Sequence, residues 1–159
     1  MKKIFLFLIF LIMFGCSSQK EINQEEKILI GKIERQSLNT PDFPWYQRNY
    51  QNYTAQDSII NKLKGDYSDI YCKIFLGTWC SDSKREVSRL LKIFDLVSIK
   101  NYEIIGLGRD KKSINGEEKG LNILKVPTII FYKNGNEIGR IIETPTKTLE
   151  EDILNILSK

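Results

Sequence analysis

The chain has 159 residues, with 24 basic and 20 acidic side chains and no histidine, a formal net charge of +4 at pH 7. Because basic and acidic residues are interspersed, no charged stripe indicates a nucleic-acid partner, and the length suits one domain with a hydrophobic core. The lack of histidine excludes Cys-His catalysis and argues against a zinc or copper site, so we expect no metal and no cofactor.

Residues 1–15 have the pattern of an export signal. Two lysines precede an uncharged apolar stretch, residues 4–14, which is too short for a membrane span of about 20 residues. The Gly15-Cys16 pair resembles the lipobox of bacterial lipoproteins, which implies that Cys16 is lipidated as the first residue of the mature chain. We therefore expect a bacterial cell-envelope protein, anchored to the membrane through Cys16 and facing the periplasm or the exterior. Residues 16–26 are then a polar tether, and ordinary signal cleavage or an uncleaved anchor are the alternatives.

Residues 27–53 form an expected extension at the amino-terminal side of the main domain. An apolar segment over residues 28–33 predicts an opening strand. Three tyrosines at helical spacing follow Pro44, which is a favoured residue for the first position of a helix. We expect the aromatic side chains of this helix to pack in the core, with a substrate-facing role for Trp45 or Tyr46 as the alternative.

Residues 54–159 alternate strands and helices. The expected elements are a helix over 56–64, a strand over 70–76, a helix over 80–94, a strand over 102–107, a short helix over 117–124, two strands over 128–132 and 137–142 around an Asn-Gly hairpin turn, and a last helix that begins with the capping box Thr148-x-x-Glu151. Two strands joined through a helix are parallel, and the hairpin adds an antiparallel pair. The pattern predicts an α/β fold: a mixed central sheet with helices on both faces.

Cys80 comes shortly after the apolar strand 70–76 and stands at the start of the next helix. The free backbone N–H groups and the helix dipole favour a thiolate there; Lys84 and Arg85 add to this effect and Asp82 opposes it. Export implies an oxidising compartment, in which cysteines normally pair. Eight residues of extended chain separate Cys72 from Cys80, a span of about 26 Å, whereas a disulfide needs Cα atoms within about 7 Å. We therefore expect Cys72 to be buried and inert, and Cys80 to be free to react.

Ser83 stands three residues after Cys80, where a dithiol oxidoreductase has its second cysteine. The chain can therefore attack a disulfide but has no adjacent thiol to resolve the product, which indicates monothiol exchange. Ser83 either donates its hydroxyl to the Cys80 thiolate or caps the helix through the capping-box pattern Ser83-x-x-Glu86. Asp82 is either a solvated carboxylate of the first turn or a proton shuttle for Cys80.

Two separate segments resemble the thioredoxin superfamily: Trp79-Cys80-Ser81-Asp82-Ser83-Lys84 and Val126-Pro127-Thr128-Ile129-Ile130-Phe131-Tyr132-Lys133-Asn134-Gly135. The first also resembles the Trp-Cys-x-Asp-Ser motif of exported thioredoxin-like lipoproteins of bacteria, and the resemblance runs from about residue 54 to the end. It implies a thioredoxin-like three-layer sandwich in which Pro127 has a cis peptide bond and lies against Cys80. Val126 would offer its backbone to a substrate strand, next to Trp79. Ile74 departs from the pattern, because thioredoxins have a buried aspartate there for proton transfer.

Two functions follow from these observations. The first is a membrane-anchored, monomeric protein that exchanges disulfides through Cys80, with exported protein thiols or disulfides or a small thiol as partners and an external thiol for resolution. The second is a redox-inactive module that binds an exported protein or peptide in the groove beside Pro127 and Trp79. The missing second cysteine and the missing acid at Ile74 favour the second function, and the position of Cys80 favours the first.

Overall fold

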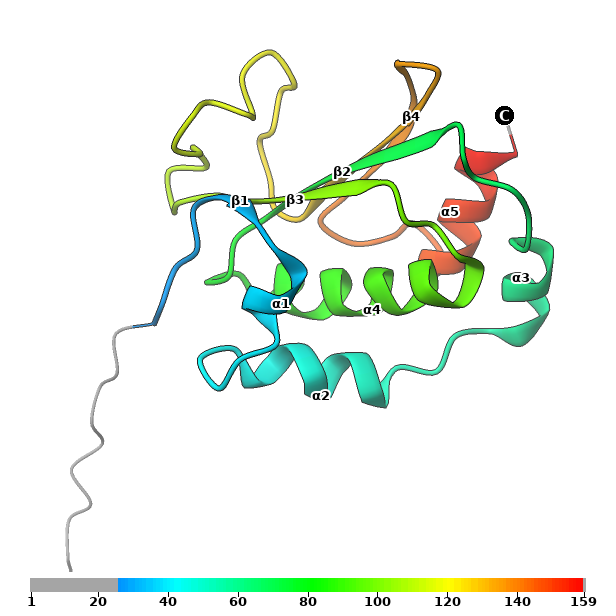
Figure 1. The fold of residues 1–159 in the computed structure, drawn as a ribbon, viewed down its shortest axis with the longest axis horizontal. Helices are drawn as coiled ribbons and strands as arrows, with labels where there is room; N and C mark the ends of the chain where they lie inside the picture. The colour runs from blue at the N-terminus through cyan, green and yellow to red at the C-terminus, as the bar shows by residue number, and fades with distance from the viewer. Residues whose placement is uncertain (1–25, 159) are drawn as a thin grey trace, which may run out of the picture.

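The structure is a computed structural model that describes residues 26–158 (Figure 1). Its elements are β1 (Gly31–Ile33), α1 (Arg35–Leu38), α2 (Pro44–Asn52), α3 (Asp57–Lys62), β2 (Ile70–Leu76), α4 (Ser81–Val97), β3 (Tyr102–Gly106), β4 (Thr128–Lys133), β5 (Asn136–Ile142) and α5 (Leu149–Leu157). The expected export signal, the lipidated Cys16 and the tether up to residue 25 lie outside the described residues. Among the helices described, none has the length and apolar character needed to cross a membrane.

The five strands form one mixed sheet in the order β1-β3-β2-β4-β5. β2 and β3, which are joined through α4, are parallel, and β4 is antiparallel to both β2 and β5. The short β1 pairs antiparallel with β3 at one edge. The predicted α/β fold with a mixed sheet is therefore confirmed, with the strand that leads to Cys80 at its centre.

The two faces of the sheet are covered differently. All five helices lie on one side of it (Figure 1), where Cys72, Ile74 and Leu76 of β2 join the larger hydrophobic core. Phe75 points to the other side and packs in a smaller core with side chains of the segment 107–127. The expectation of helices on both faces thus holds for one face only, since the second face is covered by a loop.

The short helix predicted over residues 117–124 is wrong, because that segment consists of turns. Gly116 and Gly120 both have φ of +75°, and Asn122 has φ of +55°. These left-handed conformations interrupt any helical run, and glycine adopts them without a steric cost. The loop still supplies apolar side chains to the second face, so it replaces the missing helix as a cover.

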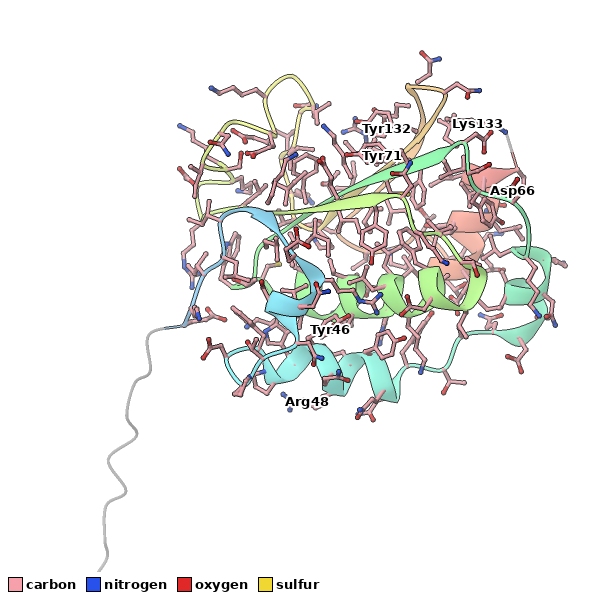
Figure 2. All side chains as sticks on the ribbon, in the orientation of Figure 1. Tyr46, Arg48, Asp66, Tyr71, Tyr132 and Lys133 are labelled. Atoms are coloured by element: carbon pink, nitrogen blue, oxygen red, sulfur yellow. The ribbon has the colours of Figure 1, made fainter. Side chains whose placement is uncertain are left out.

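Part of the second face carries no cover and is polar and aromatic. Tyr71 of β2 and Tyr132 of β4 lie side by side there (Figure 2), with ring centroids 5.9 Å apart. The Tyr71 hydroxyl donates to the Glu103 carboxylate at 2.5 Å. The polar groups of this area thus bond to one another across neighbouring strands.

The extension at residues 27–53 shares the core of the main domain. Trp45 and Tyr46 of α2 are buried in the larger core, which confirms that they serve packing. Arg35 makes a two-point ion pair with Asp95 of α4, with N–O distances of 2.8 and 2.6 Å, and donates to the Tyr46 hydroxyl at 2.7 Å. α1 and α2 are thereby fixed to α4, the helix that begins just after Cys80.

Two local signals near the end of the chain are confirmed. Asn134 and Gly135 have φ of +50° and +81°, as a two-residue hairpin turn of type I′ requires. The Thr148 hydroxyl accepts from the Glu151 backbone N–H at 3.2 Å, so the predicted cap opens α5. The hairpin holds β4 in place, and the start of β4 carries one side of the candidate site.

Candidate functional site

Cys80 lies between the end of β2 and the start of α4. A turn closed by the Cys80 N–H and the Gly77 carbonyl, 2.9 Å apart, links the two elements. Cys80 is the residue before the first helical position, with φ of −93° and ψ of 127°, and its carbonyl accepts the first helical bond from the Lys84 N–H at 3.0 Å. The side chain is partly exposed. Cys80 therefore stands at the positive end of a 17-residue helix as a partly exposed residue.

The start of β4 brings Val126 and Pro127 to Cys80. The Val126–Pro127 peptide bond is cis, as the resemblance implied. The Cys80 thiol donates to the Val126 carbonyl, with sulfur and oxygen 3.3 Å apart. Within residues 26–158 the Val126 backbone N–H has no hydrogen-bond partner. An extended peptide that pairs with Val126 would thus find a free donor next to the sulfur.

Trp79 packs against the smaller core, to which Val126 and Cys80 also belong. Its indole N–H donates to the Leu107 carbonyl at 3.0 Å, at the end of β3. A Cβ atom on Gly77 would lie only 2.6 Å from the Trp79 ring, so the absence of a side chain at residue 77 makes room for the indole. The structure brings Trp79, Cys80, Val126 and Pro127 together, as the sequence predicts.

Ser83 does not take either of the two roles considered for it. It is fully buried, and its hydroxyl accepts from the Gly77 backbone N–H at 3.1 Å. Since α4 begins at Ser81, Ser83 is the third helical residue and not the cap. No hydrogen bond joins Ser83 to Cys80 among the described residues. Its hydroxyl instead fastens the end of β2 to the first turn of α4.

The Asp82 carboxylate forms an ion pair with a basic side chain of the same helix. Its carboxylate lies 2.8 Å from the Arg85 guanidinium, three residues further on, and both side chains are more than a third exposed. No hydrogen bond between Asp82 and Cys80 occurs in residues 26–158. This geometry favours the solvated first-turn carboxylate over the proton shuttle.

The other described cysteine, Cys72, is fully buried in the larger core, as expected. Burial in these apolar surroundings raises the pKa of the Cys72 thiol well above its ordinary value. Ile74, at the position of the family's buried acid, is also fully buried. Over residues 26–158, no three Cys, Asp or Glu side chains are grouped in a way that could hold a metal ion.

Three polar residues next to the site escaped the sequence analysis. The buried Thr78 hydroxyl accepts from the Leu29 N–H at 3.2 Å and so fixes the segment 26–30 to the Cys80 turn. The Arg109 guanidinium lies 5.3 Å from the Trp79 ring centroid. Glu26, the last residue of the expected tether, bonds to Arg109 at 3.1 Å. Arg109 follows β3, and Cys80 follows β2. Because the two strands are parallel, their carboxyl ends lie at the same edge of the sheet, so the sequence could have predicted that Arg109 lies near the site.

The mixed sheet with its helices forms a thioredoxin-like fold. The chain matches no protein-family model. It is 28% identical over 86 residues to the curated thioredoxin of Echinococcus granulosus, a match that covers 54% of this chain and 75% of that protein.

Two solved structures share the fold at low identity. A crystal structure of a protein of unknown function from Pseudomonas aeruginosa has a TM-score of 0.59 and 16% identity, over 72% of this chain and 82% of that one. An HIV epitope scaffold has a TM-score of 0.54 and 16% identity, over 72% of this chain and 80% of the scaffold. At such identities these likenesses concern the fold alone.

Proposed function

We propose that this thioredoxin-like protein carries out monothiol thiol–disulfide exchange through Cys80. The observation that carries the proposal is Cys80, a partly exposed residue at the start of α4 whose sulfur lies 3.3 Å from the Val126 carbonyl oxygen. Similarity to a thioredoxin supports the class of chemistry. Ser83, buried and bonded to Gly77, supplies no thiol for resolution.

The exchange has two balanced steps. The Cys80 thiolate attacks one sulfur of a substrate disulfide, a Cys80–substrate bond forms, and the other sulfur leaves as a thiolate that water protonates. An external thiolate then attacks the substrate sulfur of the mixed disulfide and leaves with it as a new disulfide, which frees Cys80. The free N–H of Val126 holds the substrate backbone beside the sulfur during the first step.

The test is to trap the intermediate. Purified protein is mixed with an excess of a disulfide-linked peptide, and adducts are mapped by mass spectrometry after acid quenching. We expect a stable adduct on Cys80 and none in a Cys80→Ser variant; exchange of equal rate in that variant would contradict the proposal.

A redox-inactive peptide-binding module is the second candidate. It is favoured by the buried Ile74 in place of the family's acid and by the engagement of the thiol with Val126. Binding of a cysteine-free peptide beside Pro127, equal in the wild type and in Cys80→Ser, together with an unreactive Cys80, would support it over exchange.

We also propose that the protein is anchored to a bacterial membrane through a lipid on Cys16. The support is the Gly15-Cys16 pair after an apolar signal of the right length. Cell fractionation tests this: the wild type should sediment with membranes and a Cys16→Ser variant should not be lipidated. A wild-type protein whose Cys16 carries no lipid by mass spectrometry would contradict the anchor.

A further inference from the structure

Two cations contact the turn that carries Cys80. Lys84 belongs to the first turn of α4, and its backbone N–H bonds to the Cys80 carbonyl at 3.0 Å. Arg109 comes from the loop after β3, with its guanidinium over the Trp79 ring, 5.3 Å from the centroid. We call Lys84 and Arg109 the cationic pair. Their backbones belong to different elements, but both side chains reach Glu26, and Arg109 also covers Trp79, the residue before Cys80.

One carboxylate occupies the cationic pair. Glu26 has one oxygen 2.5 Å from the Lys84 Nζ atom and the other 3.1 Å from the Arg109 guanidinium. The two oxygens are thus divided between two cations, which is the arrangement of a bound anion rather than of a single ion pair. The cationic pair therefore has the spacing needed to receive a carboxylate.

Glu26 stands at the start of the segment 26–30, whose later residues are anchored, with Leu29 packed against the larger core. Residues 26–30 contain no helix or strand. Beyond Glu26, the Leu29 N–H and the Lys27 carbonyl bond to Thr78 at 3.2 and 3.3 Å, and Lys27 pairs with Asp42 at 2.5 Å. Exposed ion pairs contribute little individually, so another carboxylate near Cys80 can compete with Glu26 for the cationic pair.

We propose that the cationic pair is a carboxylate-binding subsite for the disulfide substrate, and that Glu26 fills it when no substrate is bound. The preferred substrate is then a disulfide with a carboxylate close to its sulfur atoms. This inference rests on the proposed exchange function and names its substrate class. Glu26 acts as an internal competitor, and Lys84 and Arg109 determine specificity.

The experiment compares two small disulfides of opposite charge character on the full-length protein in neutral detergent. The probes are 5,5′-dithiobis(2-nitrobenzoate), which carries a carboxylate on each half, and neutral 2,2′-dithiodipyridine. Each reacts by thiolate attack of Cys80, with formation of a mixed disulfide and release of a coloured thiolate or thione. The readout is the rate constant for the anionic probe divided by that for the neutral probe. A variant that changes only the reactivity of Cys80 alters both rate constants and leaves this ratio unchanged.

Opening the subsite should favour the anionic probe. We expect Glu26→Gln to raise the ratio about two- to fivefold, the range expected for one or two exposed ion pairs. Lys84→Gln and Arg109→Gln should each lower it. Asp42→Asn is the matched control, since it removes an ion pair of the same segment without touching the cationic pair, and its ratio should equal that of the wild type.

A double-variant cycle separates occupation of the subsite from general repulsion between charges. In a Lys84→Gln/Arg109→Gln background, Glu26→Gln should no longer change the ratio. The same increase in both backgrounds would overturn the inference, as would a ratio that is equal in all variants while Cys80 still reacts with both probes. Failure of Cys80 to react with either probe would instead overturn the exchange function itself.

Discussion

Cys80 and Ser83 lie three residues apart at the start of α4 but in opposite environments. Cys80 is partly exposed, and its thiol donates to the Val126 carbonyl. Ser83 is fully buried and accepts from the Gly77 N–H, which ties the strand to the helix. Cys80 thus lies partly in solvent, and Ser83 holds the turn that carries it.

Replacing Ser83 by cysteine tests the monothiol character. In Ser83→Cys an internal thiol can attack the mixed disulfide on Cys80, so the adduct should stop accumulating and a disulfide between Cys80 and the introduced thiol should appear. Loss of the hydroxyl acceptor for Gly77 should lower stability by about 1 kcal/mol. The measurement is a mass-spectrometric time course, with Ser81→Cys as a control that adds a thiol at an exposed position. An adduct that accumulates in Ser83→Cys as in the wild type would contradict this interpretation.

Gly77 tests how tightly the turn is packed. A Cβ atom there would lie 2.6 Å from the Trp79 ring, so Gly77→Ala must displace the indole and break its bond to the Leu107 carbonyl. We expect a loss of about 1 to 3 kcal/mol in the free energy of unfolding, measured by urea denaturation. Gly65→Ala is the control, because the nearest atoms to a Cβ there are 3.7 Å away. Equal stability of the two variants would show that the ring moves freely.

At the scale of elements, three units position the site. β2 and α4 present Cys80, and the residues just before β4 include Val126 and Pro127. α2 lies on the side of α4 away from the sheet (Figure 1), and Arg35 of α1 ties this brace to Asp95 of α4. The brace depends on Arg35, which bonds to Asp95 through two nitrogens, and on Tyr50, whose hydroxyl donates to the same carboxylate at 2.6 Å.

This brace predicts a pH-dependent stability. The hydrogen bonds from Arg35 hold the pKa of Asp95 below its ordinary value. Its stabilisation is therefore complete above the unfolded-state pKa of about 3.9 and is lost as the pH falls through the lower folded-state pKa. Asp95→Asn should lower the free energy of unfolding by about 1 kcal/mol at pH 7, since both partners remain partly in solvent, and the difference from the wild type should vanish in acid. Denaturation at several pH values checks this, with Asp69→Asn as control; a difference that persists at pH 2 would exclude the ionic origin.

The sequence predicted correctly those elements whose characteristic residues lie within the element itself. The apolar run 70–76, the Asn134-Gly135 turn and the Thr148 cap each determine their structure through neighbouring residues. The prediction of a helix over 117–124 was wrong because Gly116, Gly120 and Asn122 have left-handed backbone conformations. The spacing of apolar residues along the sequence does not reveal such conformations. The capping role predicted for Ser83 was wrong because α4 begins at Ser81, which makes Cys80 the residue at the cap position.

The site was predicted where a motif covers it and missed where distant segments meet. Trp79, Cys80, Val126 and Pro127 lie in two short motifs, and the structure joins them. Glu26 is 58 residues from Lys84 and 83 from Arg109, and ion pairs over such separations leave no local pattern. Only the folded sheet brings these segments to one edge.

In the whole molecule, the residues of the candidate site gather at one edge of the sheet, the edge at which β2 and β3 end. Helices cover one face, a loop covers part of the other, and Cys80 lies where β2, β4 and that loop meet. The segment 26–30 reaches the same edge. Ten residues separate Cys16 from Glu26, and a fully extended chain of that length spans about 35 Å. A lipid on Cys16 would therefore keep the Cys80 edge close to the membrane, within reach of disulfides at its surface.

The most direct test of the account is the alkylation rate of Cys80 in the native full-length protein. Iodoacetamide is added at pH 7, and modification of Cys80 and Cys72 is followed by peptide mapping, natively and in urea. We predict that Cys80 is alkylated in the native protein, because this residue is partly exposed, and that Cys72 reacts only after unfolding, because it is fully buried. A native Cys80 as unreactive as Cys72 would contradict the account.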